Sequence, residues 1–406
     1  MCRMRYLGWK YKTMAKLFPH IGHISVVDYV PTIKKDSFFT QALYLITFIK
    51  TATLFMFLSH RYYAIRKPVI TLFANFRNNK YIIWPPSVDV SKLSKSREAD
   101  WPAVLFFIHI HLLSLYGIWI LFFEAKLLTA IFLVVLTSVA ILGVTTGAHR
   151  LWAHRTYEAS TELRIVLMLF QTMVGHGSIY DWVQFHRLHH AHYKTDTDPL
   201  NSRKGFLYAH FITRLRKISQ YQEALKNSID MTDIENDSVV MFQKRFYWIL
   251  YGVLFVLLPL NAPLEYWNES VLGAIFVIGF LRYALVLHAA WLIESAVCVW
   301  GLNEGEKYPP DTNTVFILNR TFWPEYHYIY PHDYKSGEYG TYGSGCSTAF
   351  IRVFAALGLA TNLRTLESNT LQKALAESAK TKRPIQACLE DAVRSQILPE
   401  HHFLKL

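Results

Sequence analysis

Four long apolar runs constrain the fold of this 406-residue chain more than any other feature. They cover Ala103–Phe123, Leu127–His149, Phe246–Leu264 and Ser270–Ile293. A helix of 21 residues, the length of the first run, spans about 31 Å, which is enough to cross the hydrocarbon core of a bilayer. Arg282 is the one charged residue inside these runs, and we expect it to face protein because a charge at mid-membrane is costly. The sequence therefore predicts an all-α membrane protein.

Short connections pair the four predicted transmembrane helices into two hairpins. Glu124–Lys126 joins the first pair and Glu265–Glu269 joins the second. Residues 150–245, between the hairpins, hold 13 Lys and Arg against 10 Asp and Glu, and the chain has a net charge of +12. Because cytosolic loops carry an excess of Lys and Arg, we expect both termini and a helical cap on the cytosolic side. No zinc-finger, RNA-binding or helix-turn-helix pattern accompanies this charge, so we expect no nucleic-acid partner.

The two ends of the chain flank this predicted membrane unit. We divide the chain into an N-terminal region (1–100), a transmembrane and cap domain (101–366) and a polar, helical C-terminal tail (367–406). Within the first region, Phe38–Ser59 is apolar apart from Lys50. This segment either crosses the membrane, lies in its interface or anchors the chain, and these alternatives stay open. The four cysteines form no CxxC pair, which fits a reducing compartment.

Histidines gather at two places beside the membrane. The second apolar run ends in a segment that carries His149 and His154, and a later segment carries His186, His189 and His190. Residues at i, i+3 and i+4 share one face of a helix, so the last three are expected to point the same way. A lone histidine in an apolar run is usually a buried polar residue, but such a group predicts a metal site. The spacing does not fix the metal.

These motifs resemble the membrane-bound acyl-CoA desaturases of animals, of the stearoyl-CoA desaturase kind. The resemblance extends from about Trp101 to Leu366 and leaves the first hundred residues and the tail unmatched. The segments that carry it are Gly147–Tyr157, His186–His190, Asp198–Phe206, Trp291–Ile293 and Tyr330–Tyr334.

The resemblance implies an O2-dependent oxidoreductase of the endoplasmic reticulum membrane, with its histidine boxes in the cytosol. Such enzymes hold two irons, receive electrons from a small cytochrome b and its NADH-dependent reductase, and introduce a cis double bond into a fatty acyl-CoA. A redox metal suits this chemistry because methylene C–H bonds are too strong for acid–base residues. We therefore expect no catalytic residue beyond the metal centre.

The resemblance implies a complete first iron site and an incomplete second one. The first would use five histidines: His149, His154, His186, His190 and His327. For the second, His189 matches, but the family's His-Asn-Tyr-His-His reads Pro324-Glu-Tyr-His-Tyr328 here. Where the family has a further ligand histidine, this chain has Cys298, and where the family has a water-holding asparagine, this chain has Glu294. Glu294 and Cys298, at i and i+4, could rebuild a metal site as carboxylate and thiolate; the alternative is a weakened or vacant site.

The substrate end also departs from the family. The resemblance implies substrate contacts at Trp291, Arg216 and Lys217, the last two shifted by one position. The family has Asn, Arg and Asp at three positions that contact the CoA head, and this chain has Gly177, Gln184 and Phe185 there. Loss of an arginine should weaken recognition of CoA phosphates. Two functions therefore stand beside each other, a fatty acyl-CoA desaturase and a catalytically impaired relative that binds lipid or a partner protein; a related oxygenase is a third, weaker alternative.

Overall fold

The computed structural model describes residues 92–300, 322–338, 342–343 and 345–395, and the apolar segment Phe38–Ser59 lies outside them. Helices account for nearly all the regular structure in the described part, which confirms the all-α prediction. The strands in this part are β1 (Glu158–Ala159) and β2 (Ala360–Thr361), which form one short antiparallel pair.

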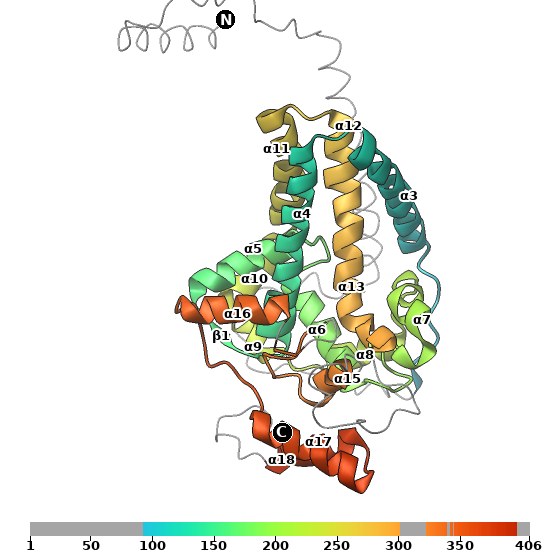
Figure 1. Cartoon of the computed structure of the whole chain (residues 1–406). Helices are drawn as coiled ribbons and strands as arrows, with labels where there is room; N and C mark the ends of the chain where they lie inside the picture. Colours follow the sequence, from blue (N-terminus) through green and yellow to red (C-terminus); the bar gives the residue numbers. More distant parts are fainter. Residues whose placement is uncertain (1–91, 301–321, 339–341, 344, 396–406) are drawn as a thin grey trace, which may run out of the picture. The chain divides into compact units, whose positions relative to one another are not determined.

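Four helical stretches in the described residues are long and apolar enough to cross a membrane: Trp101–Phe123, Leu127–Ala153, Ser238–Trp267 and Val271–Val299. They confirm the two predicted hairpins (Figure 1). All four are longer than the apolar runs that predicted them, the first by only two residues. The second, third and fourth stretches continue into the cap, so the predicted ends at His149, Phe246 and Ile293 were too short. Polar residues at these ends remain helical because cap elements pack against them.

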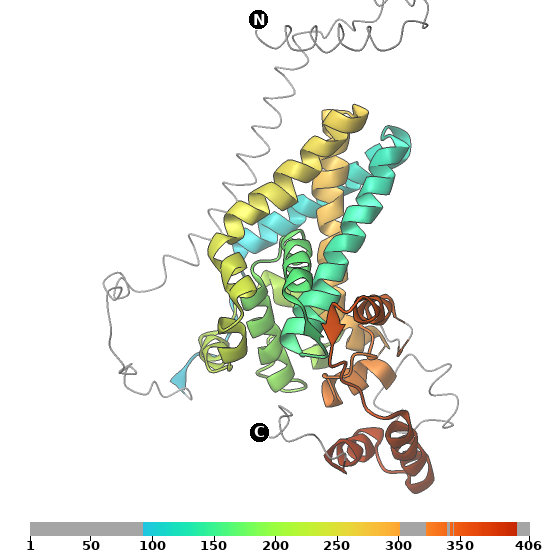
Figure 2. The same ribbon diagram turned by 90° about the vertical axis from the view of Figure 1, so that its left-hand side faces the viewer.

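The stretches consist of several helical segments each. The first is α3 (Trp101–Phe123), and the second joins α4 (Leu127–Leu142) to the π-helix η3 (Gly143–Ala153). The third and fourth are assembled as follows: α10 (Ser238–Tyr251), η6 (Gly252–Leu257) and α11 (Leu258–Trp267), then α12 (Val271–Gly273), η7 (Ala274–Leu281) and α13 (Arg282–Trp300). Helix α13 packs against both α3 and α4, and α4 also contacts α11 (Figures 1 and 2).

Close backbone packing joins the first and fourth stretches. A Cβ atom at Gly117 would lie 2.3 Å from the carbonyl oxygen of Phe276, so only glycine permits this approach. Arg282 is fully buried, and its guanidinium donates to the carbonyl oxygens of Ile278 at 2.7 Å and Phe255 at 2.6 Å. The prediction that Arg282 faces protein is therefore confirmed. The opposite faces of α3 and α4 expose large apolar side chains, as expected of surfaces that contact lipid.

The cap is a group of shorter helices between and after the hairpins. Its elements are α5 (Thr161–Thr172), α6 (Ile179–Ala191), η4 (Ser202–Lys204), α7 (Phe206–His210), η5 (Ile212–Leu215), α8 (Gln220–Asn227), α9 (Thr232–Glu235), α15 (Phe322–Ile329) and α16 (Cys346–Ala356). Ser160 and Ser178 cap the N-termini of α5 and α6 through their side chains. The buried Gln243 accepts from the backbone N–H of Ile179 at 2.8 Å and donates to Thr172 at 2.9 Å, which fixes α6 against α5 and α10.

The C-terminal tail contains two helices, α17 (Ser368–Thr381) and α18 (Ile385–Ser395). Their outer faces are polar, but their inner faces bury Leu371, Leu375 and Leu389. These leucines share an apolar cluster with Tyr326 of α15 and with Tyr330, which follows that helix. The tail therefore packs behind the helix that carries His327.

Candidate metal centre

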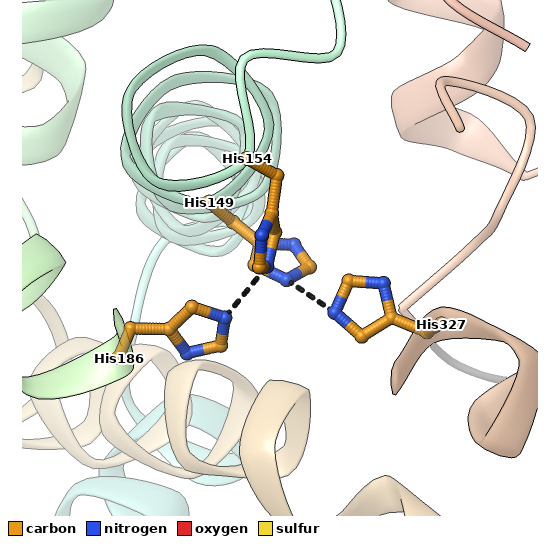
Figure 3. A group of neighbouring side chains, drawn as sticks. All are labelled: His149, His154, His186 and His327. Atoms are coloured by element: carbon orange, nitrogen blue, oxygen red, sulfur yellow. Dashed lines mark hydrogen bonds between the residues drawn. The ribbon is translucent and has the colours of Figure 1, made fainter. Parts of the chain in front are cut away.

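Three elements bring five histidines together. His149 lies in η3, and His154 follows at the end of that helix, where its backbone N–H donates to the His149 carbonyl at 3.0 Å. His186 and His190 lie one turn apart on α6, and His327 comes from α15. A π-helix is rare and often marks a functional site, and here it carries His149 and ends at His154. Figure 3 shows four of these imidazoles pointing toward a common centre.

The ring nitrogens of this cluster converge. Nε2 of His149 lies 3.1 Å from Nε2 of His327, and Nε2 of His154 lies 2.9 Å from Nε2 of His186 (Figure 3). The ligand atoms of these four residues all lie within 4.8 Å of one another. The centroid of the His190 ring lies 4.4 Å from that of His154 and 4.7 Å from that of His186, and its buried Nε2 has no hydrogen-bond partner in the described part of the chain. A transition metal is the partner that this donor set fits.

Burial keeps the imidazoles in their neutral form. It lowers the pKa of His186 to about 3 and lowers the pKa of His154, His190 and His327 well below the usual value. The neighbouring imidazoles act in the same direction, because each would repel a second positive charge. Neutral imidazole is the form that ligates metals, so these residues are ready to bind one without first losing a proton.

A buried carboxylate orients His149. Nδ1 of His149 lies 3.2 Å from Oε1 of Glu338, which also accepts a 2.7 Å hydrogen bond from Nε of Arg150. Ser347 donates to the other oxygen of Glu338. Burial alone would raise the pKa of the Glu338 carboxyl, but Arg150 and His149 together outweigh burial and lower that pKa to about 2. The ionised carboxylate can only accept, so His149 carries its proton on Nδ1 and directs the Nε2 lone pair into the centre.

Comparison with known proteins places these motifs in a family. The chain is 41% identical over 281 residues to the acyl-CoA Delta-9 desaturase of Acheta domesticus, covering 68% of this chain and 78% of the relative. It is 35% identical over 275 residues to the acyl-CoA Delta12-desaturase of the same species, covering 66% and 76%. It is 36% identical over 279 residues to the stearoyl-CoA desaturase of Homo sapiens, covering 68% and 77%. The chain belongs to the acyl-CoA desaturase family.

No family model matches this sequence, so the relatives alone identify the desaturase. The family consists of oxidoreductases, and the four apolar helical stretches make this member a membrane protein. The oxidoreductase family and the membrane location were both expected from the sequence motifs.

His189 has partners outside the cluster of five. Its Nδ1 lies 2.8 Å from Oδ1 of Asp198, and its Nε2 lies 2.8 Å from the hydroxyl of Tyr328. Asp198 is fully buried and also accepts from the backbone N–H of Leu200. His189 shares the helix face with His186 but meets a different set of side chains.

Glu294 and Cys298 also contact other residues of this desaturase. The Glu294 carboxylate pairs with the Arg214 guanidinium and lies 3.4 Å from Nδ1 of His186. The Cys298 thiol donates to the Ser202 carbonyl at 3.6 Å. Among the described residues, the group of convergent metal-binding side chains is formed by histidines and includes neither of them.

The residues expected at the substrate occupy two kinds of environment. Trp291 is buried, and its ring packs edge-on against Phe107 at 5.1 Å and beneath the Arg214 guanidinium at 5.6 Å. Arg216 is exposed, and Lys217 lies 3.9 Å from the exposed carboxylate of Glu98. Trp291 therefore lies in a buried, aromatic setting, whereas Arg216 is exposed and Lys217 is half-buried.

Three important residues were not singled out by sequence reasoning. Glu338 contacts His149, Arg214 pairs with Glu294, and Asp198 contacts His189. Asp198 stands in one of the segments that carry the resemblance, which is the one signal that could have found it. Glu338 lies 189 positions from His149, and no local spacing indicates such a pair.

Proposed function

We propose that this chain is a fatty acyl-CoA desaturase that introduces a cis double bond into an acyl chain with O2. The observation that carries the proposal is the convergence of four buried imidazoles, with the partly buried His190 ring beside them, at the motif positions of a family whose relatives are acyl-CoA desaturases. The reaction removes two hydrogen atoms from adjacent methylenes. O2 is reduced to two waters with two electrons and two protons from the donor, so electrons and atoms balance.

Iron is the metal that we propose for this centre. His149, His154, His186, His190 and His327 would hold it, and it would supply the redox chemistry that breaking a methylene C–H bond requires. The chain's own residues perform the positioning. Glu338 holds the His149 tautomer, burial of the cluster excludes water, and Trp291 supplies an apolar wall for the acyl chain. A small cavity beside the cluster is lined by His149, His327, Tyr328 and Glu338.

The remaining assignments follow from orientation and from the family. We place the protein in the endoplasmic reticulum membrane with both termini and the histidine cluster in the cytosol. The excess of basic residues between the hairpins supports this orientation. A small cytochrome b and its NADH-dependent reductase are the proposed electron donors, as the family resemblance implies.

A second candidate function is a catalytically impaired relative that binds lipid or a partner protein. The observation that favours it is the pairing of His189 with Tyr328 rather than with the histidine cluster. Loss of the polar residues expected at the CoA head, which are Gly177, Gln184 and Phe185 here, points the same way.

Expression in cells that lack their own desaturase separates the two candidates. New cis double bonds in the cellular lipids would support the desaturase, and their loss in His154→Ala would tie the activity to the cluster. An accumulated, membrane-inserted protein that binds iron but forms no new double bond would refute the desaturase and leave the impaired relative.

A further inference from the structure

We propose that Tyr328 and Arg214 close the position of the second metal, so that this chain holds one iron where the resemblance implies two. This inference rests on the proposed iron site and concerns only the residues beside it. The side chains left at the second position are His189, Glu294 and Cys298. The argument follows their contacts one by one.

The metal-binding lone pair of His189 is already used. Nδ1 of His189 faces the carboxylate of Asp198, which accepts, so the ring proton resides on Nδ1. Nε2 is then a pure acceptor, and the phenol of Tyr328 donates its proton to it at 2.8 Å. A metal could bind His189 only by displacing this proton.

The phenol is held in place by stacking on both sides of the site. The Tyr328 ring lies parallel to the Tyr193 ring, with centroids 3.5 Å apart and planes inclined by 3°. It also stacks on His190 at 4.8 Å. Tyr328 directly follows His327 in α15, so the phenol is attached next to a proposed ligand of the first iron.

The carboxylate at the second position already has a positive partner. Glu294 is buried and pairs with Arg214, whose guanidinium lies between the rings of Phe185 and Trp291. A divalent cation would have to replace this guanidinium and would meet its charge at close range. The Cys298 thiol donates to the Ser202 carbonyl, so it is engaged as a neutral thiol.

The first site differs in one decisive respect. His149 carries its proton on Nδ1, toward Glu338, so its Nε2 lone pair points at Nε2 of His327, 3.1 Å away, and stays beside imidazole nitrogens that can share a metal. At His189 the facing atom is a hydroxyl that brings its own proton. The same chain therefore prepares one position for a metal and satisfies the other with hydrogen bonds.

Metal content of the full-length protein, purified in detergent after expression in iron-supplemented medium, tests the inference. We expect one iron per chain, retained in His189→Ala and lost in His154→Ala. Two irons per chain would overturn the inference and leave the proposed function intact. No iron in the wild-type chain would instead overturn the iron site on which both rest. A visible phenolate charge-transfer band that disappears in Tyr328→Phe would also overturn the inference, because Tyr328 would then be a metal ligand.

A gain of metal tests the role of the two residues. The triple variant Pro324→His, Tyr328→His, Cys298→His restores the family's histidines and should bind a second iron. The matched control carries Tyr328→Phe in place of Tyr328→His, which removes the phenol proton without adding a ligand, and should bind less. Adding Arg214→Gln to the triple variant should raise the affinity for the second iron further. A triple variant that stays at one iron would show that Tyr328 does not exclude the metal, and no effect of Arg214→Gln would remove Arg214 from the proposal.

Discussion

Glu338→Gln should weaken metal binding without touching a ligand. The carboxylate fixes the proton of His149 on Nδ1 across 3.2 Å, and a glutamine of the same size removes the charge that does so. Partners that orient metal-bound histidines typically contribute 10- to 100-fold in affinity, which corresponds to about 1.4 to 2.7 kcal/mol. We therefore expect a loss of affinity in that range.

The same substitution also affects the stability of the fold. Arg150 is buried, donates to Glu338 at 2.7 Å and keeps its contact with the Tyr334 carbonyl in the variant. Leaving one partner of a buried ion pair without its counter-charge costs about 3–5 kcal/mol. Thermal unfolding of the metal-free protein must therefore be measured beside metal affinity.

Competition between the protein and a chelator of known affinity measures the first effect. Ser347→Ala is the matched control, because it removes a hydrogen bond to the other Glu338 oxygen and leaves the His149 contact in place. It should retain wild-type affinity. An unchanged affinity in Glu338→Gln, with the variant folded, would refute the argument that Glu338 sets the tautomer of His149.

Three further predictions concern pH, packing and the tail. Burial lowers the pKa of His186 from 6.5 to about 3, so the unfolded state binds more protons between these values. The metal-free protein should therefore lose stability as pH falls from 6.5 toward 3, and a flat profile in thermal unfolding would contradict this. Gly117→Ala should lower the melting temperature because its Cβ would meet the Phe276 carbonyl, whereas Gly252→Ala, which has open space around it, should leave it unchanged. Truncation after Leu366 removes α17 and α18 from behind α15 and should lower iron content, while equal iron content in the truncated and full-length proteins would show that the tail does not support the site.

The sequence predicted features that depend on local patterns. Apolar runs of transmembrane length identified all four spans, and the histidine boxes together with the family resemblance singled out the four histidines that the structure brings together. The predicted runs were too short at the cap ends of three spans, because hydropathy falls where polar residues enter the cap while the backbone stays helical. Sequence reasoning also missed pairs such as His189 with Tyr328, which are 139 positions apart, because only the folded chain brings them into contact.

The two halves of the proposed centre obey the same rule about buried polar atoms. A buried donor or acceptor without a partner is destabilising, so a site that has no metal is expected to acquire hydrogen bonds. His189 shows this outcome, since Asp198 and Tyr328 satisfy both of its ring nitrogens. In the cluster of five, the buried Nε2 of His190 has no hydrogen-bond partner among the residues that the structure describes, and the lone pair of His149 faces another imidazole. A chain that had lost both metals would have no reason to keep these atoms converging, and this contrast is why we assign a metal to the first position and none to the second.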